Sequence, residues 1–191
     1  MRHRLLIGLV VGGALVVGAP ALASQDTGSD SVSSGAVDVS PLPSIAPNIT
    51  ESRRFAPQLP RNTGTGRRVV YSNSLQWVWV VDKNETILRS MPVSGRRGVP
   101  APGTYKVTSQ SEWSFSLDFV GVNFRWMTRF ATGPDGGNIG FHEIPRKDGK
   151  PLQTVSQLGS FAGSGCVRMS TEDVKFIYRW ARPGTAVVVT R

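Results

Sequence analysis

The sequence predicts a mostly β domain with one principal helix. This domain begins near residue 67 and runs to the end of the chain. Short apolar runs bounded by glycine, proline and asparagine recur along this part, which is typical of strands joined by turns. One segment near the C-terminus instead carries apolar residues at the spacing of a helix face. The 125 residues involved are a common size for one domain with one hydrophobic core.

The first part of this domain is predicted to be a strand followed by a β-hairpin. Residues 68–71 and 75–82 are rich in valine and tryptophan, and larger apolar residues alternate with smaller or polar ones along the second segment. The turn residues Lys-Asn-Glu at 83–85 lead into a further strand at 86–93. We therefore expect 75–82 and 86–93 to pair.

Further strands are expected after a loop rich in proline and glycine at residues 95–102. They cover residues 103–108, 122–131, 138–142 and 185–190. The stretch 143–161 contains two prolines and two glycines and is expected to be loop-like. The tryptophans of the domain are expected to be core or cleft-wall residues, namely Trp77, Trp79, Trp113 and Trp126.

The single predicted helix follows Ser170. This serine is an expected N-cap, and the acidic residues Glu172 and Asp173 in the first turn favour a helix N-terminus. Apolar residues then fall at the i, i+3, i+4 and i+7 positions, namely Val174, Ile177, Tyr178 and Ala181. The sequence Pro-Gly at 183–184 is a fitting end to the helix.

The N-terminal residues predict an exported protein. Residues 1–23 contain a basic start, an apolar run from 5 to 17 and a final Ala-Leu-Ala, which together make a secretory signal. An uncleaved anchor is the alternative, although 13 apolar residues are few for a membrane span. Residues 24–66 are rich in Ser, Gly, Asp, Thr and Pro, so they are expected to be a disordered tether before the domain at 67–191.

The charge of the chain points to an acidic partner. The formal net charge is +9, and residues 67–191 alone have 17 Lys and Arg against 9 Asp and Glu, or +8. A basic domain is compatible with nucleic-acid binding. However, the chain has no basic run interleaved with aromatic residues, and an exported protein rarely meets nucleic acid. We therefore expect it to meet the anionic polymers of a cell envelope or wall, or to be released outside the cell, with no nucleic-acid partner.

Beyond residue 23 the chain has one cysteine and one histidine, Cys166 and His142. A thiolate is a strong nucleophile, and an imidazole is the usual base that generates it at neutral pH. A buried cysteine that acts as a small apolar residue is the alternative. Glycines beside Cys166 leave backbone N–H groups accessible, and an unused exported thiol is open to oxidation, so catalysis is favoured. The helix that begins four residues later could lower the thiol pKa if its axis points at the sulfur. One cysteine and one histidine predict no metal site.

Two short motifs, at the separation found here, resemble the L,D-transpeptidase (YkuD-like) catalytic domain family. They are Ile-Gly-Phe-His at 139–142 and Ser-Gly-Cys-Val-Arg-Met-Ser at 164–170. The opening hairpin, the segment 92–105 and the strand with Met-Thr-Arg-Phe at 127–130 precede them in the family's order, so the resemblance covers nearly all of 67–191. It implies a YkuD-like β-sandwich or barrel whose principal helix follows the catalytic cysteine. The family commonly has His-Gly-Cys where this chain has Ser-Gly-Cys, a variant similar to actinobacterial-type members.

The resemblance also implies roles for individual residues. Cys166 would be the nucleophile and His142 its base. Gly165 and Ser164 would shape the oxyanion site, while Arg168 and Phe141 would contact substrate. The alternative for Arg168 is a structural ion pair with Glu172, and both remain open.

The function implied is that of an exported cysteine L,D-transpeptidase acting on peptidoglycan stem peptides. A thioester at the cysteine would form with release of D-Ala, and an amine of a second stem or water would then take the acyl group. Carbapenem-type β-lactams would be covalent inhibitors, no cofactor or metal would be needed, and the protein would be a monomer. The alternatives are a non-catalytic envelope-binding module with a decayed site and a generic cysteine amidase or protease.

Overall fold

The computed structural model describes residues 56–191, which form two β-sheets, one α-helix and a short 3-10 helix. The predicted signal at 1–23 and the tether up to residue 55 lie outside the described residues. The mostly β class with one principal helix is confirmed. Among the described helices, none has the length and apolar character to cross a bilayer.

The first sheet has five strands in the order β3-β2-β1-β11-β4. Their bounds are β1 (Arg68–Ser72), β2 (Trp77–Val81), β3 (Ile87–Pro92), β4 (Gly103–Lys106) and β11 (Ala186–Thr190). The predicted hairpin is present as the antiparallel pair β2 and β3. The final strand β11 lies in parallel beside β1 and antiparallel to β4, so the end of the chain completes the sheet that its first strands began.

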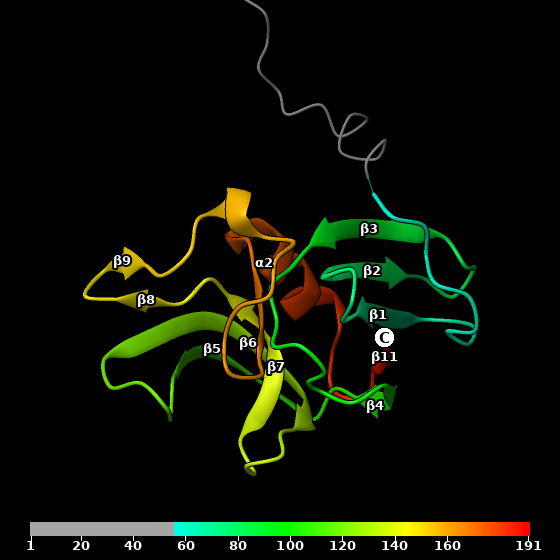
Figure 1. The fold of residues 1–191 in the computed structure, drawn as a ribbon. Helices are drawn as coiled ribbons and strands as arrows, with labels where there is room; N and C mark the ends of the chain where they lie inside the picture. Colours follow the sequence, from blue (N-terminus) through cyan, green and yellow to red (C-terminus); the bar gives the residue numbers. More distant parts are fainter. Residues whose placement is uncertain (1–55) are drawn as a thin grey trace, which may run out of the picture. The chain divides into compact units, whose positions relative to one another are not determined.

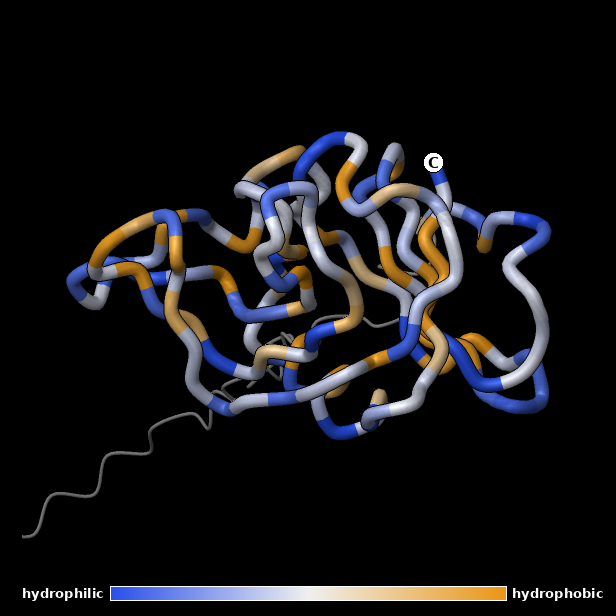
Figure 2. Tube along the Cα trace, turned by 90° about the horizontal axis from the view of Figure 1, so that it is seen from below, coloured by the Kyte–Doolittle hydropathy of each residue, from blue (hydrophilic) through white to orange (hydrophobic). Residues whose placement is uncertain are grey.

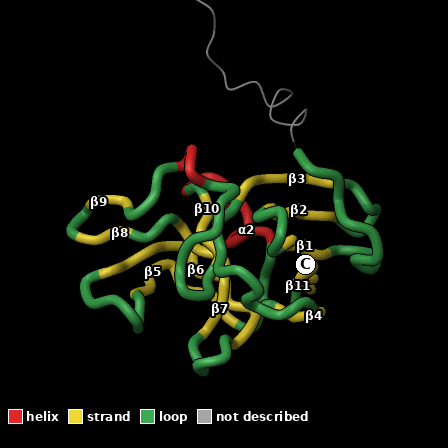
Figure 3. Tube along the Cα trace, in the orientation of Figure 1, coloured by secondary structure: helices red, strands yellow, loops and turns green. Residues whose placement is uncertain are grey.

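The second sheet has the order β10-β7-β6-β8-β9, and β5 pairs with the other edge of β6. Its strands are β5 (Ser109–Phe115), β6 (Val122–Thr132), β7 (Asn138–Glu143), β8 (Arg146–Lys147), β9 (Lys150–Pro151) and β10 (Val167–Met169). β5 and β10 were not expected from the sequence, nor was the small β8–β9 hairpin within the expected loop. Figure 3 shows the long connection from β9 to β10, interrupted only by the 3-10 helix η1 (Val155–Gln157).

The helix α2 (Thr171–Trp180) follows β10 directly. As predicted, Ser170 caps it, because the Ser170 Oγ accepts a hydrogen bond of 3.1 Å from the backbone N–H of Asp173. Arg89 of β3 then forms ion pairs with both Glu172 and Asp173 in its first turn. Figure 1 shows α2 at the centre of the molecule, with the first sheet on one side and the second sheet on the other.

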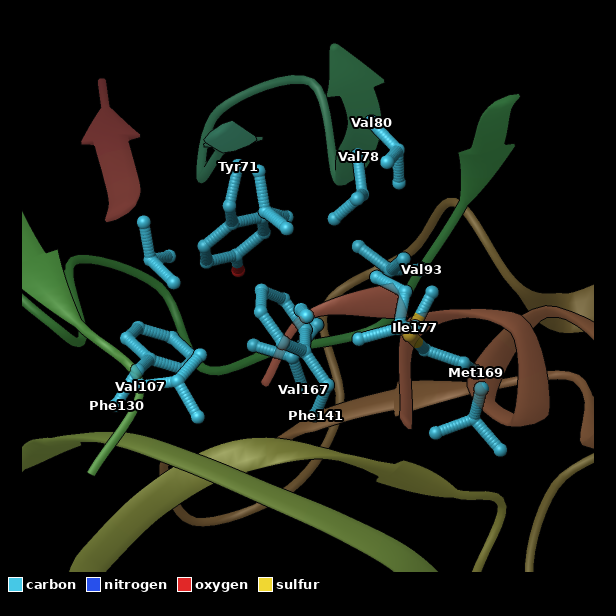
Figure 4. Close-up of a cluster of buried hydrophobic side chains, with 14 of the residues drawn as sticks. Tyr71, Val78, Val80, Val93, Val107, Phe130, Phe141, Val167, Met169 and Ile177 are labelled. Atoms are coloured by element: carbon cyan, nitrogen blue, oxygen red, sulfur yellow. The ribbon is translucent and has the colours of Figure 1, made fainter. Parts of the chain in front are cut away.

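The main hydrophobic core fills the space between the two sheets and α2. Figure 4 shows side chains from both sheets and from the helix converging there. Fully buried members are Val69, Tyr71, Val78, Val80, Phe141, Val167, Met169, Val174 and Ile177. A smaller cluster on the opposite face of the first sheet contains Val70, Trp79 and Val81. Burial on both faces explains why β1 and β2 read as nearly continuous valine and tryptophan runs.

The end of the predicted tether packs against the domain. Leu59 contacts the smaller cluster, and the Pro57 carbonyl accepts a hydrogen bond of 3.1 Å from the Trp79 indole. Thr63 is buried, and its hydroxyl lies 3.4 Å from the Arg68 guanidinium. Residues 56–66 therefore cover one face of the first sheet. Their composition concealed this, because a few anchoring contacts suffice to fix a polar segment.

A bulge between β6 and β7 depends on a glycine. The register between these strands shifts between Arg129 and Ala131, and Gly140 lies opposite Arg129. A Cβ atom on Gly140 would stand 2.4 Å from the Thr128 carbonyl oxygen and 2.9 Å from the Met127 methyl carbon. The Thr128 carbonyl oxygen cannot move away without breaking the pairing of β6 and β7. Glycine at this position therefore allows β7 to approach β6.

We expect Gly140→Ala to destabilise the fold by about 1–3 kcal/mol, because the added methyl group overpacks the β6–β7 contact. Gly137→Ala is the matched control, since a Cβ there meets nothing within 4 Å. Thermal unfolding of the two variants checks the prediction. Equal melting temperatures for both would contradict the steric role of Gly140.

Candidate active site

The two candidate catalytic residues are brought together by a parallel strand pair. β10 pairs with β7 so that Arg168 lies opposite His142 and Val167 lies opposite Phe141. Cys166 immediately precedes β10, at the register of Gly140. Because side chains alternate along a strand, Cys166 and Arg168 face the same side of the sheet as His142.

This side of the second sheet carries a cleft of about 770 Å³ lined by both His142 and Cys166. Its wall includes the end of β5 with the following loop at 114–119, the β6–β7 loop at 133–139 and the segment 163–166. Residues far apart in the sequence thus enclose one volume. A concave site with a nucleophile and a titratable group is the usual form of an active site.

His142 is buried, with 4% of its surface exposed. Its ring Nδ1 is hydrogen-bonded to the backbone carbonyl of Glu143, so Nδ1 carries the proton and Nε2 keeps a free lone pair. The Phe124 ring stacks on the imidazole at 4.0 Å between ring centroids. Burial, only partly opposed by the Glu143 carbonyl, lowers the pKa of His142 to about 4. The imidazole is therefore neutral at neutral pH.

The Glu143 side chain is directed to the helix. Its carboxylate accepts a hydrogen bond of 2.6 Å from the Thr171 hydroxyl at the start of α2. Glu143 thus contributes in two ways. Its carbonyl orients the His142 ring, and its carboxylate ties the end of β7 to α2.

Cys166 is half-buried, and its thiol lies 3.3 Å from the Asn138 carbonyl, to which it donates. Burial raises the pKa of the Cys166 thiol. The backbone of Gly140 and the guanidinium groups of Arg129 and Arg168 act in the opposite direction without overcoming it. The resting pair therefore consists of a protonated thiol and a neutral imidazole.

The helix α2 begins shortly after Cys166 in the chain. The three residues of β10 and the N-cap Ser170 separate the two, and the Ser170 hydroxyl accepts a hydrogen bond from the Asp173 N–H. Burial dominates the environment of Cys166, and its pKa is raised. The net pKa of the thiol is thus raised by burial, and a lowering contribution from the helix stays a prediction.

The segment before Cys166 presents free backbone donors. In the described part of the chain, the N–H groups of Ser164, Gly165 and Cys166 donate no hydrogen bond to a backbone or side-chain acceptor. Gly163 has φ of +87°, a conformation that glycine adopts at little cost, whereas Gly165 has no positive φ. The Ser164 carbonyl accepts from the Arg96 guanidinium at 3.3 Å, which holds the segment in place. Unpaired N–H groups beside a nucleophile are the elements of an oxyanion hole.

Arg168 is half-buried, and its side chain lines the cleft. A Cβ on Gly163 would lie 3.3 Å from its Nε, so the guanidinium lies close to the Cys166 segment. The alternative ion pair with Glu172 is absent, because Glu172 pairs with Arg89 at 2.5 Å. Within residues 56–191 the Arg168 guanidinium has no acidic partner.

Phe141 does not contact the cleft, so its expected contact with substrate is corrected. It is fully buried, and its ring stacks on Phe130 at 4.7 Å between centroids. It lies between Gly140 and His142, and alternation along β7 turns it towards the core. Its contribution is to anchor the strand that carries the histidine.

Several cleft residues were missed by the sequence reading. Arg129 lines the cleft and donates to Ser111 at 3.0 Å and Ser114 at 3.3 Å. Asp118 and Phe124 also line the cleft. The alternation of side chains along β6 could have placed Arg129 in the cleft. Ser111 and Ser114 could not be placed in the same way, because β5 was not predicted. Among the described residues, no group of three or more His, Cys, Asp and Glu is placed to hold a metal ion.

Because His142 is neutral in the folded protein, we expect the free energy of unfolding to fall at acidic pH. The ordinary pKa of histidine is near 6.5, so the unfolded chain binds the proton first and stability is lost as pH falls from 6.5 towards 4. We expect His142 to account for about 2–3 kcal/mol of lost unfolding free energy between pH 7.5 and 4.5. Urea unfolding of the wild type and of His142→Gln at both pH values isolates the contribution of His142 to this loss of unfolding free energy. Parallel pH dependence in the two proteins would contradict it.

Comparison with known proteins places this geometry in a family. Residues 66–189 match the model of the YkuD family, described as the L,D-transpeptidase catalytic domain. YciB of Bacillus subtilis (strain 168), itself only provisionally assigned as an L,D-transpeptidase, is 28% identical over 122 residues, which are 60% of this chain and 61% of YciB.

Solved structures show the same fold. An L,D-transpeptidase from Mycobacterium smegmatis matches with a TM-score of 0.52 and 17% identity, over 67% of this chain and 60% of that one. The L,D-transpeptidase LdtMt1 in complex with imipenem matches with a TM-score of 0.51 and 18% identity, over 66% and 60%. The chain thus spans about three fifths of the length of these relatives. With a family match that covers most of the two-sheet domain, this chain belongs to the YkuD family of L,D-transpeptidase catalytic domains.

Proposed function

We propose that this protein is a cysteine L,D-transpeptidase that acts on peptidoglycan stem peptides. The observation that carries the proposal is one cleft lined by both His142, on β7, and Cys166, which immediately precedes the neighbouring strand β10. Unpaired backbone N–H groups beside the thiol support the same chemistry. The serine of Ser-Gly-Cys, in place of the histidine common in the family, leaves His142 as the base.

The first step is activation of the thiol by general-base catalysis. The Glu143 carbonyl holds the proton on Nδ1 of His142, so Nε2 accepts the proton of the Cys166 thiol. Because the thiol pKa is raised and the imidazole pKa is about 4, an ion pair does not form beforehand. The proton is transferred as the sulfur attacks the carbonyl carbon of the third stem residue.

The second step forms the thioester. Attack by sulfur leaves a tetrahedral intermediate with negative charge on oxygen, and the N–H groups of Gly165 and Cys166, which have no acceptor among the described residues, would bind it. The carbon–nitrogen bond then breaks, and the terminal D-Ala leaves as the amine after taking the proton from His142. An amine of a second stem attacks the thioester and yields a cross-link between third residues, with the thiol restored. Attack by water instead gives carboxypeptidase activity.

Arg168 is proposed to bind a carboxylate of the stem peptide. Its guanidinium lines the cleft without an acidic partner, and a planar fork suits a carboxylate. The positive charges of Arg168 and Arg129 also favour the thiolate form of Cys166 over the thiol. Both effects suit an acidic peptide substrate.

The proposal includes export to the cell envelope. The secretory pattern of residues 1–23 and the basic domain support contact with an anionic wall polymer. The similar structure solved with imipenem supports carbapenems as covalent probes of this cleft. No cofactor enters any step of the proposed reaction.

Acylation by imipenem, followed by intact-protein mass, tests the chemistry. We expect the wild type to gain one adduct and both Cys166→Ala and Cys166→Ser to gain none, because a serine hydroxyl does not ionise beside a single neutral imidazole. His142→Ala should acylate about 10²–10⁴ times more slowly through loss of the base. An adduct on Cys166→Ala, or a loss of only a few fold in His142→Ala, would contradict the mechanism. Release of D-Ala from a tetrapeptide stem, with analysis of dimers, then establishes the reaction.

Ser164→Ala tests whether the residue in the place of the second histidine takes part. Ser164 is exposed, and its hydroxyl has no hydrogen-bond partner among residues 56–191. We expect the acylation rate to stay within about fivefold of wild type, which corresponds to about 1 kcal/mol for a lost hydrogen bond. The rate constant at several imipenem concentrations is the measurement. A variant as inactive as Cys166→Ala would make Ser164 a catalytic group.

A further inference from the structure

An exposed aromatic strip lies on β5, an edge strand of the second sheet. Trp113 is 61% exposed and Phe115 is 69% exposed, which corrects the expectation that Trp113 is a core or cleft-wall residue. Two residues apart on one strand, they point to the same side about 7 Å from each other. Figure 2 shows hydrophobic stretches beside hydrophilic ones at the end of the molecule that carries the β5–β6 connection. Large exposed apolar groups that gather in this way mark interaction surfaces.

Cationic side chains adjoin this strip. The Arg125 guanidinium lies over the Trp113 ring at 4.7 Å and over the Trp126 ring at 4.9 Å. It also forms an ion pair with Glu112. Lys175 of α2 lies 5.4 Å from the Trp126 ring. Together Trp113, Phe115, Arg125 and Trp126 form what we call the β5 platform.

The β5 platform offers hydrogen-bond donors on its exposed side. The Arg125 side chain is 37% exposed, and the Glu112 carboxylate pairs with only one of its terminal nitrogens. The Arg125 Nε and the Trp126 indole N–H have no partner among the described residues, but both atoms are buried and out of reach of an external ligand. A ligand that complements this surface offers a flat apolar face for the Trp113 indole and oxygen atoms for the guanidinium. A pyranose ring has both, because its axial C–H groups form one face and its hydroxyl and acetamido oxygens surround it.

The β5 platform is continuous with the cleft. Phe115 and its neighbours Ser114 and Ser116 line the cleft wall, while Trp113 lies two residues before Phe115 on the same strand. A stem peptide is covalently attached to a strand of N-acetylated hexosamines. If a stem occupies the cleft, as the proposed function requires, that sugar strand must pass close to its mouth.

We propose that Trp113 and Phe115, with Arg125, bind the N-acetylhexosamine strand that carries the stem peptide. The sugar ring stacks on the Trp113 indole, and its oxygens accept from the Arg125 guanidinium. The chain thereby distinguishes stems on polymeric glycan from free stem peptides. The catalytic groups Cys166 and His142 take no part in this contact.

Binding of N-acetylchitotetraose to the full chain tests the proposal directly. We expect the Trp113 indole N–H resonance to shift in a two-dimensional NMR titration, and Trp113→Ala to weaken binding about tenfold. Trp113→Phe should keep most of the affinity, and Phe115→Ala should show a smaller loss. Leu88→Ala is the matched control, because Leu88 is 41% exposed on the first sheet and should leave binding unchanged. A wild type whose indole resonances do not shift would overturn the proposal.

Acylation by imipenem is measured in parallel, so that the two proposals fail separately. Sugar binding without acylation supports the β5 platform while removing the transpeptidase function. Acylation without sugar binding supports the transpeptidase function and overturns the β5 platform as a sugar site. On polymeric peptidoglycan, Trp113→Ala should raise KM and leave kcat unchanged, with no effect on a free tetrapeptide stem. If Trp113→Ala instead abolishes sedimentation with phosphatidylglycerol vesicles and no sugar binds, the strip is a membrane contact and the glycan proposal is overturned.

Discussion

Strand β10 is only three residues long, yet the position of the thiol depends on it. On one side it pairs in parallel with β7, and on the other Ser94 and Arg168 exchange backbone hydrogen bonds of 2.8 and 3.0 Å. Ser94 is itself fully buried, and its hydroxyl accepts from Gln153 at 2.8 Å. A strand this short has little pairing energy of its own. It is fixed because it has a neighbour on both sides, β7 in the same sheet and the isolated bridge to Ser94 just after β3, and this places the thiol beside the strand that contains His142.

Burial shifts the pKa values of His142 and Cys166 in opposite directions. It favours the neutral form of both groups, which lowers the pKa of His142 and raises that of Cys166. The Gly140 backbone and the guanidinium groups of Arg129 and Arg168 favour the thiolate, without overcoming the effect of burial. When the thiol loses its proton, the carbonyl group of a bound substrate can accept the negative charge. The empty cleft contains no group, among the described residues, that could accept it. In the proposed mechanism, proton transfer would therefore be coupled to attack on substrate, and Arg129 and Arg168 would act mainly in the transition state.

The sequence predicted those elements whose signal is local. The β2–β3 hairpin, β11 and α2 were found because valine runs, turn residues and the Ser170 cap are contained in a few neighbouring residues. β5 was missed because Ser-Gln-Ser-Glu begins it and its exposed face gives no apolar period. β10 was missed because three residues between glycines and a helix cap form no pattern.

The candidate pair Cys166 and His142 was recognised by residue type, but its closeness rests on parallel pairing across 24 residues of chain, which no local pattern encodes. Phe141 is the instructive error. Its neighbour His142 faces the cleft, so alternation along β7 already required Phe141 to face the core. Trp113 is the converse case, since an indole on an edge strand remains in solvent where no second layer covers it.

The protonated state of the resting thiol has a consequence for the lifetime of the protein. Peroxides and disulfides react with a thiolate, and a thiol whose pKa is raised by burial offers them very little of it. The Asn138 carbonyl, which accepts from the thiol, strengthens that protection. With a single cysteine in the chain, no second thiol could rescue an oxidised Cys166 by forming an internal disulfide. If the protein is exported as proposed, slow reaction of the resting thiol would protect this one sulfur atom from oxidation until a substrate binds.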